Sequence, residues 1–358
     1  MLLYLGLTVL TVLLAYAVNN QSISDTNRIT RQQVCNRIFI ISIFTLLFMV
    51  SAGRYYVGND YGEYVGTFAK IHMSRKVSSE LGFNTVVRAI QILCGYEQFI
   101  PVFAVFSFAT VAFFLKAIYD QAEWFPYSFF LFMASGYYLS SLNTVRYYFA
   151  LAIAMFAAKY IIQRDYTRFL IWILVAAMFH KTVLLVIPVY WFASKKWKKI
   201  EIAFLLVLCT SLLFFKDFYR SIIFKIYPYY ENSVFDTGNT SYSNIIKGLC
   251  ILVFALLFYK QAIFHNKKNE FYFNLNIGAL LVYLFASFIP EVSRIGYYMN
   301  AFQVFLIPNI LVRIPDKKQR IFFTSAITIA YFLYFAIFMY RASGVELRII
   351  PYATWIMR

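Results

Sequence analysis

Long apolar runs alternate with short polar connectors along almost the whole chain. Runs such as Met1 to Ala17, Ile38 to Gly53 and Ile321 to Tyr340 are nearly free of polar residues, which is typical of helices that cross a bilayer. The pattern predicts an all-α, polytopic membrane protein with about 11 to 12 membrane segments in a single domain over 1–358. The expected segments are 1–18, 37–53, 98–116, 125–142, 144–162, 167–194, 200–215, 245–263, 272–290, 296–312 and 320–341.

The first apolar run differs from a secretory signal peptide. It has no basic start, and Ala15-Tyr16-Ala17 is a poor match to a cleavage site. We therefore expect it to be a permanent first span.

The segment 165–194 is predicted to be a short helical hairpin. Basic residues in short connectors mark the expected cytoplasmic side, and they include Lys195 to Lys199. A single crossing over 167–194 would put these lysines outside. A break at His180-Lys181-Thr182 would return these lysines to the cytoplasmic side, because helices over about 165–180 and 182–194 could then form a hairpin with its apex at the outer face. Each arm is shorter than a full span, so the hairpin is expected to be partly re-entrant.

With this topology, polar segments gather on the outer face. Two long outer loops are predicted, 54–97 and 216–244, and the same face receives Asn143 to Arg146, His180 and Pro290 to Arg294. A helix in the first loop would place one set of apolar residues on one face, with Arg88 and Gln91 opposite, as in a helix lying at the membrane interface. That set is Phe83, Val86, Val87, Ile90 and Leu93.

Composition strengthens the membrane prediction and reduces the kinds of ligand that the chain is expected to bind. The chain is 61% hydrophobic and 14% charged, whereas soluble domains are about half apolar and a quarter charged. The net charge of +17 is scattered through connectors, so we expect no nucleic-acid partner. The cysteines lie far apart, and Asn59-Asp60 is not a D-x-D cluster. Neither a metal site nor a cofactor is therefore expected.

The most unusual connector is Arg54-Tyr55-Tyr56-Val57-Gly58-Asn59-Asp60-Tyr61-Gly62-Glu63-Tyr64. Arg54 suits an anionic ligand, Asp60 or Glu63 suits a base, and tyrosines such as Tyr61 suit a sugar-binding surface. The alternative is an aromatic belt with a solvated turn.

Two further arginines and one histidine stand at the expected outer ends of apolar helices. Arg146, followed by Tyr147, could grip a phosphate or simply extend to the interface. Arg294 could do the same or pair with Glu291. His180 is a candidate base, although a lone histidine more often satisfies a nearby carbonyl. Together with Arg54, these residues fit a lipid-linked diphosphate, and no nucleotide-binding motif competes with that interpretation.

These stretches resemble the EpsG branch of the Wzy-type polymerases of bacterial surface polysaccharides, which include O-antigen, capsule and exopolysaccharide. The resemblance covers about residues 50–310 and rests on RYYVGNDYGEY at 54–64, NTVRYYFALAIAMFAAKYIIQRDY at 143–166, FLIWILVAAMFHKTVLLVIPVYW at 169–191 and SRIGYYMNAFQVFLIP at 293–308. The family usually has Thr where Asn59 stands and often Gln where Tyr147 stands. Both departures leave the charged positions unchanged.

The resemblance implies a metal-independent membrane glycosyltransferase. Such an enzyme transfers the growing glycan from undecaprenyl diphosphate to the nonreducing end of a lipid-linked repeat unit, at the outer face of the inner (cytoplasmic) membrane. Arg146 and Arg294 would bind the diphosphate with help from Arg54, and His180 or Asp60 would be the base. Glu63, Tyr61 and Tyr147 would bind substrate, and a chain-length regulator is a possible partner.

Two rival functions remain open at this point. An O-antigen ligase would use similar arginines with another acceptor. A transporter or flippase of lipid-linked oligosaccharides should line a central cavity with charge from both sides. The polar groups here gather at one face, which favours an enzyme.

Overall fold

The computed structural model describes all residues except 20–29, 227–230, 232–239, 290–291, 345–346 and 358. In this described part the chain is helical and forms no β-sheet, which confirms the predicted all-α membrane fold. Its α-helices are α1 Leu2–Ala15, α2 Arg31–Ala52, α3 Tyr61–His72, α4 Leu81–Cys94, α5 Ile100–Gln121, α6 Phe125–Ala134, α7 Tyr137–Ser141, α8 Val145–Ile162, α9 Tyr166–Ala177, α10 Val186–Ala193, α11 Lys199–Phe214, α12 Lys216–Ile226, α13 Tyr242–Leu257, α14 Lys267–Phe285, α15 Val292–Asn300, α16 Gln303–Val312 and α17 Lys317–Arg341.

Five helical segments in the described residues are long and apolar enough to cross a membrane. They are Arg31–Ala52, Ile100–Gln121, Val145–Ile162, Arg294–Val312 and Lys317–Arg341. A sixth would be α11 with α12, which are bent by 88°. Several of the other predicted segments contain shorter apolar helices, and local breaks divide some of them. One such break is Gly136, whose φ of 76° ends α6 and starts α7 within the predicted segment 125–142.

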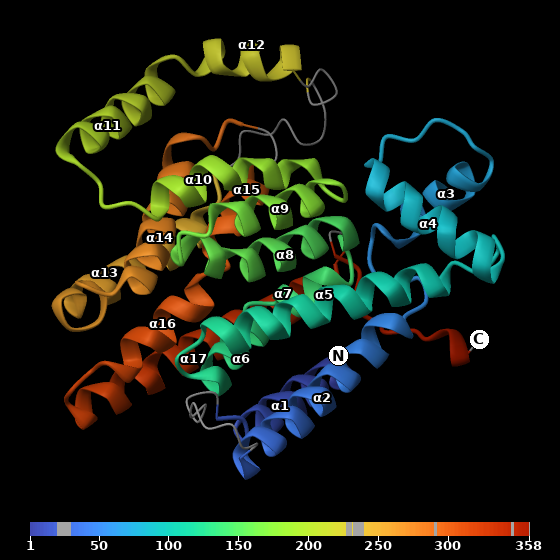
Figure 1. Cartoon of the computed structure of the whole chain (residues 1–358), viewed down its shortest axis with the longest axis horizontal. Helices are drawn as coiled ribbons and strands as arrows, with labels where there is room; N and C mark the ends of the chain where they lie inside the picture. The colour runs from blue at the N-terminus through green and yellow to red at the C-terminus, as the bar shows by residue number, and fades with distance from the viewer. Residues whose placement is uncertain (20–29, 227–230, 232–239, 290–291, 345–346, 358) are drawn as a thin grey trace. The chain divides into compact units, whose positions relative to one another are not determined.

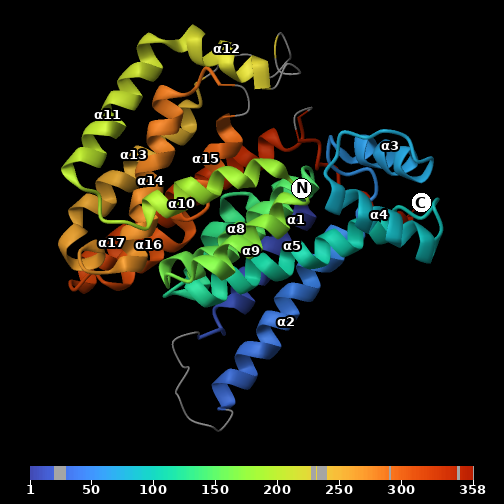
Figure 2. The same cartoon turned by 45° about the horizontal axis from the view of Figure 1, so that its top comes forward.

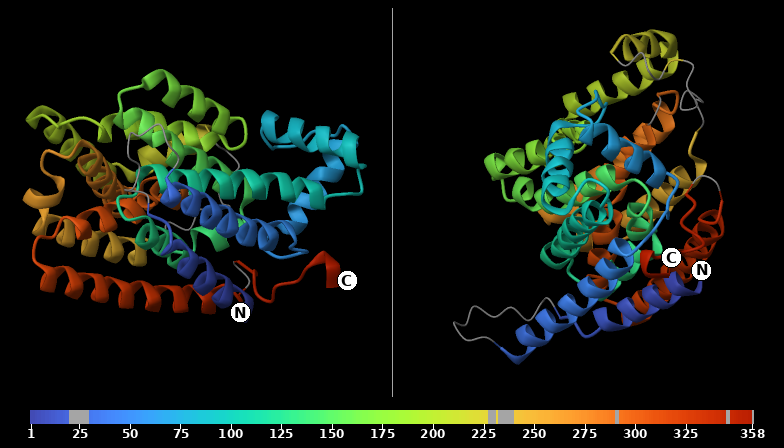
Figure 3. Two further views of the ribbon diagram at one scale, coloured as in Figure 1. Left: turned by 60° about the horizontal axis from the view of Figure 1, so that its bottom comes forward. Right: turned by 90° about the vertical axis from the view of Figure 1, so that its right-hand side faces the viewer.

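The helices divide into two compact units, and the first comprises residues 1–160, 166–184 and 314–358. Within it, Ser51 of α2 and Ser107 of α5 share a hydrogen bond of 2.7 Å between their hydroxyls. Tyr127 of α6 donates to the Thr324 carbonyl of α17 at 3.1 Å. Figures 1 and 2 show α3 and α4 beside one end of α5, and Figure 3 shows α17 as one long red helix. The first predicted outer loop is therefore mostly helical.

Local sequence explains where several of these helices begin. Thr30 and Gln33 form a capping box at the start of α2, and Asp316 accepts hydrogen bonds from two backbone amides of α17. Proline occupies the first turn of α5 and of α6, where its missing N–H costs no helical hydrogen bond.

The second unit comprises residues 161–165 and 185–313, and buried amide side chains hold it together. Asn309 donates to Asn269 at 2.9 Å, and Gln303 donates to Asn276 at 2.8 Å. Asn276 in turn donates to the Gly248 carbonyl at 3.1 Å. Because lipid offers no hydrogen-bond partners, these contacts satisfy polar groups and link α13, α14 and α16.

The predicted break inside 165–194 is confirmed. Helix α9 ends at Ala177, and the 3-10 helix η1, Lys181–Leu185, precedes α10. The other long loop, 216–244, contains α12, while most of the rest of it lies outside the described residues.

The amphipathic helix predicted in the first loop is confirmed as α4, but its faces were partly wrong. Phe83, Val87 and Ile90 are buried as expected. Gln91 is also buried, because its amide donates to the Phe68 carbonyl of α3 at 2.9 Å. Leu93 is 83% exposed, since the buried face follows contacts with α3 and α5 rather than apolar character alone.

Candidate functional site

A carboxylate, Glu80, lies at the centre of the polar cluster in the first unit. It is the residue just before α4. Its Oε2 accepts a hydrogen bond from Arg146 Nη1 at 2.6 Å, and its Oε1 accepts one from the backbone amide of Lys181 at 3.2 Å. The Nδ1 of His180 lies 3.8 Å from the same Oε1. One carboxylate thus joins the starts of α4 and α8 to the break after α9.

Aromatic rings hold the guanidinium of Arg146 from the other sides. Its Cζ lies 5.3 Å from the centre of the Phe83 ring and 5.9 Å from that of Tyr64. The Tyr64 hydroxyl also accepts a hydrogen bond from the Arg146 backbone amide at 3.4 Å. Burial raises the pKa of Tyr64, so this hydroxyl stays neutral. The Arg146 side chain keeps 28% of its surface exposed, which leaves it accessible to an anion.

His180 is buried, and its position depends on a close contact between two backbones. The Phe83 amide donates to the Met178 carbonyl at 3.3 Å. A Cβ at Gly82 would lie 2.7 Å from Met178 Cβ and 2.8 Å from the Met178 oxygen. Glycine therefore lets the segment after α9 reach α4, which brings His180 to Glu80. The ring of Tyr147 meets the His180 imidazole edge to face, with centroids 5.4 Å apart.

Asp60 lies at the start of α8 as well, although it belongs to the 54–64 motif. Its Oδ2 accepts a hydrogen bond from the Thr144 hydroxyl at 3.0 Å, and its backbone amide donates to Asn143 Oδ1 at 2.9 Å. Gly58, with a φ of 99°, lets the motif approach the Leu142 carbonyl. A carboxylate near a helix N-terminus is favourable because of the helix dipole. The motif is thereby fixed against the turn that carries Arg146.

The C-terminal segment supports the 54–64 motif, which the sequence did not reveal. The amide of Tyr55 donates to the Ala353 carbonyl at 2.9 Å, and that of Gly58 donates to the Arg348 carbonyl at 3.0 Å. No local periodicity in the sequence predicts contacts between residues about 300 positions apart.

Arg54 and Tyr61 lie behind this cluster in the core. Arg54 is only 1% exposed, and its Nη1 donates to the Ser51 carbonyl and, at 3.2 Å, to the Ser107 hydroxyl. Its guanidinium lies over the Phe103 ring, and burial lowers its pKa. Tyr61 stacks on Phe103 with centroids 4.3 Å apart. These contacts stabilise the end of α2, and a role of either residue in substrate binding stays a prediction.

The remaining predicted residues lie elsewhere. Glu63 is exposed in the first turn of α3. Arg294 is half-buried on α15 in the second unit, and its expected neighbours Pro290 and Glu291 lie outside the described residues. The structure thus brings Arg146, Tyr147, His180 and Asp60 to the start of α8. Sequence reasoning missed Glu80, for which the only signal was an acidic residue directly before an amphipathic helix.

In the described part of the chain, no group of three or more His, Cys, Asp or Glu side chains could hold a metal ion. In the cluster of Glu80, Arg146 and His180, the Arg146 guanidinium carries a permanent positive charge.

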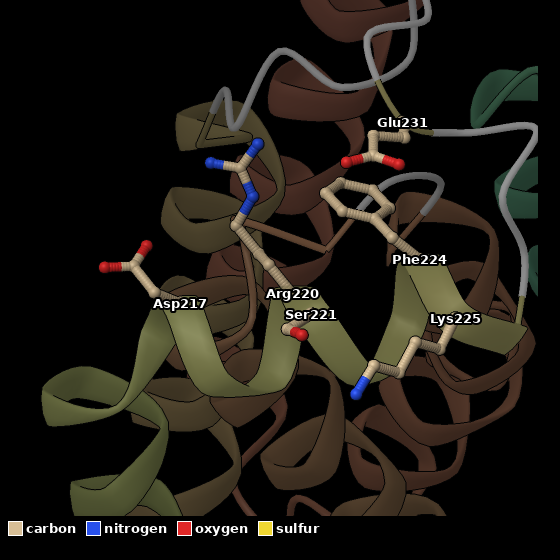
Figure 4. A pocket seen from close by; sticks show the side chains of 6 residues that line it. All are labelled: Asp217, Arg220, Ser221, Phe224, Lys225 and Glu231. Carbon is tan, nitrogen blue, oxygen red and sulfur yellow. The ribbon is translucent and has the colours of Figure 1, made fainter.

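A separate hollow of about 580 Å³ lies on α12 in the second unit. Figure 4 shows that Asp217 and Lys225 point away from Glu231. Because its charged groups do not converge on one point, this hollow adds nothing to the site.

Fold and cluster together define a polytopic helical membrane protein with an arginine-carboxylate-histidine cluster at the start of a membrane helix. The EpsG family model matches residues 37–354, so the chain belongs to the EpsG family. That membership makes it a polysaccharide polymerase-like membrane protein. The match extends to the C-terminal segment that holds the 54–64 motif. Neither a curated protein nor a solved structure matches the chain.

Proposed function

We propose that this protein polymerises a bacterial surface polysaccharide from undecaprenyl-diphosphate-linked repeat units. It transfers the growing glycan from its lipid diphosphate to the nonreducing end of a fresh repeat unit. The reaction takes place at the outer face of the cytoplasmic membrane, where the starts of α4 and α8 are expected to lie.

The observation that carries this proposal is the ion pair between Arg146 and Glu80. A guanidinium binds a carboxylate and a phosphate through the same planar fork of donors, so Glu80 occupies a place that suits an anionic group. A diphosphate brings more negative charge than one carboxylate and would displace it. Arg146 would then stabilise the charge that develops on the leaving diphosphate.

His180 suits the second requirement, a base for the acceptor hydroxyl. The hydroxyl oxygen forms a bond to the anomeric carbon of the donor, and the bond from that carbon to the diphosphate oxygen breaks. The leaving group keeps the electron pair, and the hydroxyl proton passes to the imidazole. Glu80, 3.8 Å from Nδ1, would stabilise the imidazolium that forms. Asp60, bonded to Thr144, would hold the α8 turn in place.

A ligase would use the same charge chemistry and differ only in its acceptor, whereas a flippase would need no base. The cluster here joins a cation to a candidate base, which favours a transferase over a flippase. The product separates the two transferases, since only a polymerase lengthens chains that remain on undecaprenyl diphosphate.

The test replaces Arg146 by Ala in cells that make the polysaccharide. We expect loss of long chains and accumulation of single lipid-linked repeat units on the outer leaflet. Arg75→Ala is the matched control, because Arg75 is an exposed arginine in the same loop region and its printed hydrogen bond, to the Lys70 carbonyl at 2.9 Å, comes from the backbone amide, which alanine keeps. It should leave chain length unchanged.

Normal chain length in Arg146→Ala would contradict the proposal. Repeat units trapped on the inner leaflet would instead indicate a flippase. Unchanged chain length on the lipid carrier with loss of transfer to another acceptor would indicate a ligase.

A further inference from the structure

An apolar cavity of about 430 Å³ lies within the second unit and is lined by none of the residues of the polar cluster described above. Its walls come from α10, the linker after it, α11 and α14. Trp191, Trp197, Phe204, Leu208 and Leu281 represent these four elements. The volume is in the range of ligand sites, which are about 300–1,000 Å³.

Two polar side chains in the cavity wall are hydrogen-bonded to the backbone. The Asn274 amide donates to the Ala193 carbonyl at 2.9 Å, and the Trp197 indole donates to the Phe192 carbonyl at 3.1 Å. The rest of the lining is apolar or glycine. The cavity therefore suits a hydrocarbon chain rather than a sugar.

Helix α11 forms a loose wall that leaves room for such a chain. Of its 16 residues only Cys209 is buried, so most of the helix makes few contacts within its unit. At about 1.5 Å per residue it is about 24 Å long, enough for an extended acyl chain to lie beside it.

Lysines crowd one end of this cavity. The linker between α10 and α11 holds Lys195, Lys196 and Lys198, and α11 begins at Lys199. Lys195 lies over the Trp191 ring at 3.9 Å and pairs with Glu201 at 2.9 Å. The other three are exposed, and in the described part of the chain none of them forms an ion pair. The backbone amide of Lys198 also donates to Glu201 at 2.9 Å, so this one carboxylate faces four lysines and the linker keeps an excess of positive charge beside the cavity.

We propose that this cavity and its lysines bind one anionic phospholipid. An acyl chain occupies the space between α11 and α14, and the phosphodiester headgroup rests on Lys196, Lys198 and Lys199. Tryptophans at the mouth suit the interface between headgroup and hydrocarbon. The three lysines select an anionic headgroup over a zwitterionic one, because each basic side chain adds attraction to an anionic lipid. This site is independent of the proposed polymerase reaction.

The test uses tryptophan fluorescence in the full chain. Of the five tryptophans, Trp124, Trp172 and Trp355 are replaced by Phe, which leaves the two that line the cavity. The protein is reconstituted into phosphatidylcholine vesicles that contain increasing fractions of phosphatidylglycerol with brominated acyl chains, which quench nearby indoles. Brominated phosphatidylcholine gives the quenching by bulk lipid.

We expect half-maximal quenching by phosphatidylglycerol at a mole fraction about tenfold lower than by phosphatidylcholine. Changing Lys196, Lys198 and Lys199 together to Gln should abolish this preference. The matched control changes Lys317, Lys318 and Arg320 to Gln at the start of α17, which removes the same charge and should keep it. Both sets of residues are exposed, so folding should tolerate either change.

A second variant tests the cavity itself. Leu281→Phe fills part of the space without adding a third indole to the readout, and it should weaken quenching by phosphatidylglycerol while the lysines stay intact. Equal quenching by the two lipids would overturn the proposal. So would a preference that survives the lysine changes, or displacement of phosphatidylglycerol by undecaprenyl phosphate at a lower mole fraction.

Discussion

Replacing Glu80 by Gln should have opposite effects on the proposed functions of its two partners, Arg146 and His180. Glutamine keeps the shape and can still accept a hydrogen bond from the Lys181 amide. It removes the charge that faces Arg146 at 2.6 Å and His180 at 3.8 Å. The change therefore frees the proposed anion site while it weakens the proposed base.

The structure sets the size of the first effect. The Arg146 and Glu80 side chains are 28% and 14% exposed, so the pair lies between an exposed pair and a buried one. Exposed pairs contribute about 1 kcal/mol or less, and breaking a buried pair costs about 3–5 kcal/mol. Glu80 and the donor diphosphate compete for Arg146, and we take the Glu80 interaction as about 1.4 kcal/mol. Removing it lowers the KM for the lipid-linked donor about tenfold. A general base typically accelerates a reaction about 10²–10⁴-fold. Loss of the carboxylate beside His180 removes part of that acceleration, so kcat should fall at least about tenfold.

The assay measures kcat and KM for chain extension by purified protein in nanodiscs with a defined lipid-linked repeat unit. Glu97→Gln is the matched control, since Glu97 is an exposed carboxylate in the same predicted loop. It should change neither constant. A Glu80→Gln variant with higher KM and unchanged kcat would refute the reasoning. So would a loss of activity that follows a lower melting temperature while KM stays the same, because Glu80 would then be merely structural.

Two further substitutions test how the cluster is positioned. Asp60→Asn and Thr144→Val should each slow chain extension, since they weaken one charge-assisted hydrogen bond of 3.0 Å, a bond of about 1.5–3 kcal/mol. The double variant should be no slower than the slower single one, and additive losses in kcat would argue against a shared contact. Gly82→Ala should lower kcat by pushing Met178 and hence His180 away from Glu80. Gly66→Ala has open space around the new Cβ and should be neutral, and equal kcat in the two alanine variants would contradict the positioning role.

The membrane fold was predictable from the sequence because lipid imposes a strong local signal. Apolar runs identified the long helices, and the polar interruption at His180 identified the break after α9. The number of helices that cross the whole membrane was harder to predict from the sequence. Whether a run such as 125–142 continues as one helix depends on a single backbone conformation, the left-handed φ of Gly136.

The candidate site was only partly predictable. Arg146 and His180 stood out because a charged or titratable residue among apolar ones is costly without a purpose. Glu80 did not stand out, because an acidic residue before a helix is ordinary. The burial of Arg54 against Ser51 and Ser107 was not predicted either, and its predicted role in ligand binding stays a prediction. Such differences come from long-range packing, which residue type and spacing do not encode.

The central claim is that this protein joins lipid-linked repeat units and that Arg146 is needed for the transfer. The most direct measurement mixes purified protein in liposomes with one defined undecaprenyl-diphosphate-linked repeat unit and separates the products by size. We predict a ladder of chains on the lipid carrier with release of free undecaprenyl diphosphate, and only the starting unit with Arg146→Ala. A ladder of equal length and rate with Arg146→Ala, or no ladder from the unaltered protein under conditions where it stays folded, would contradict the account.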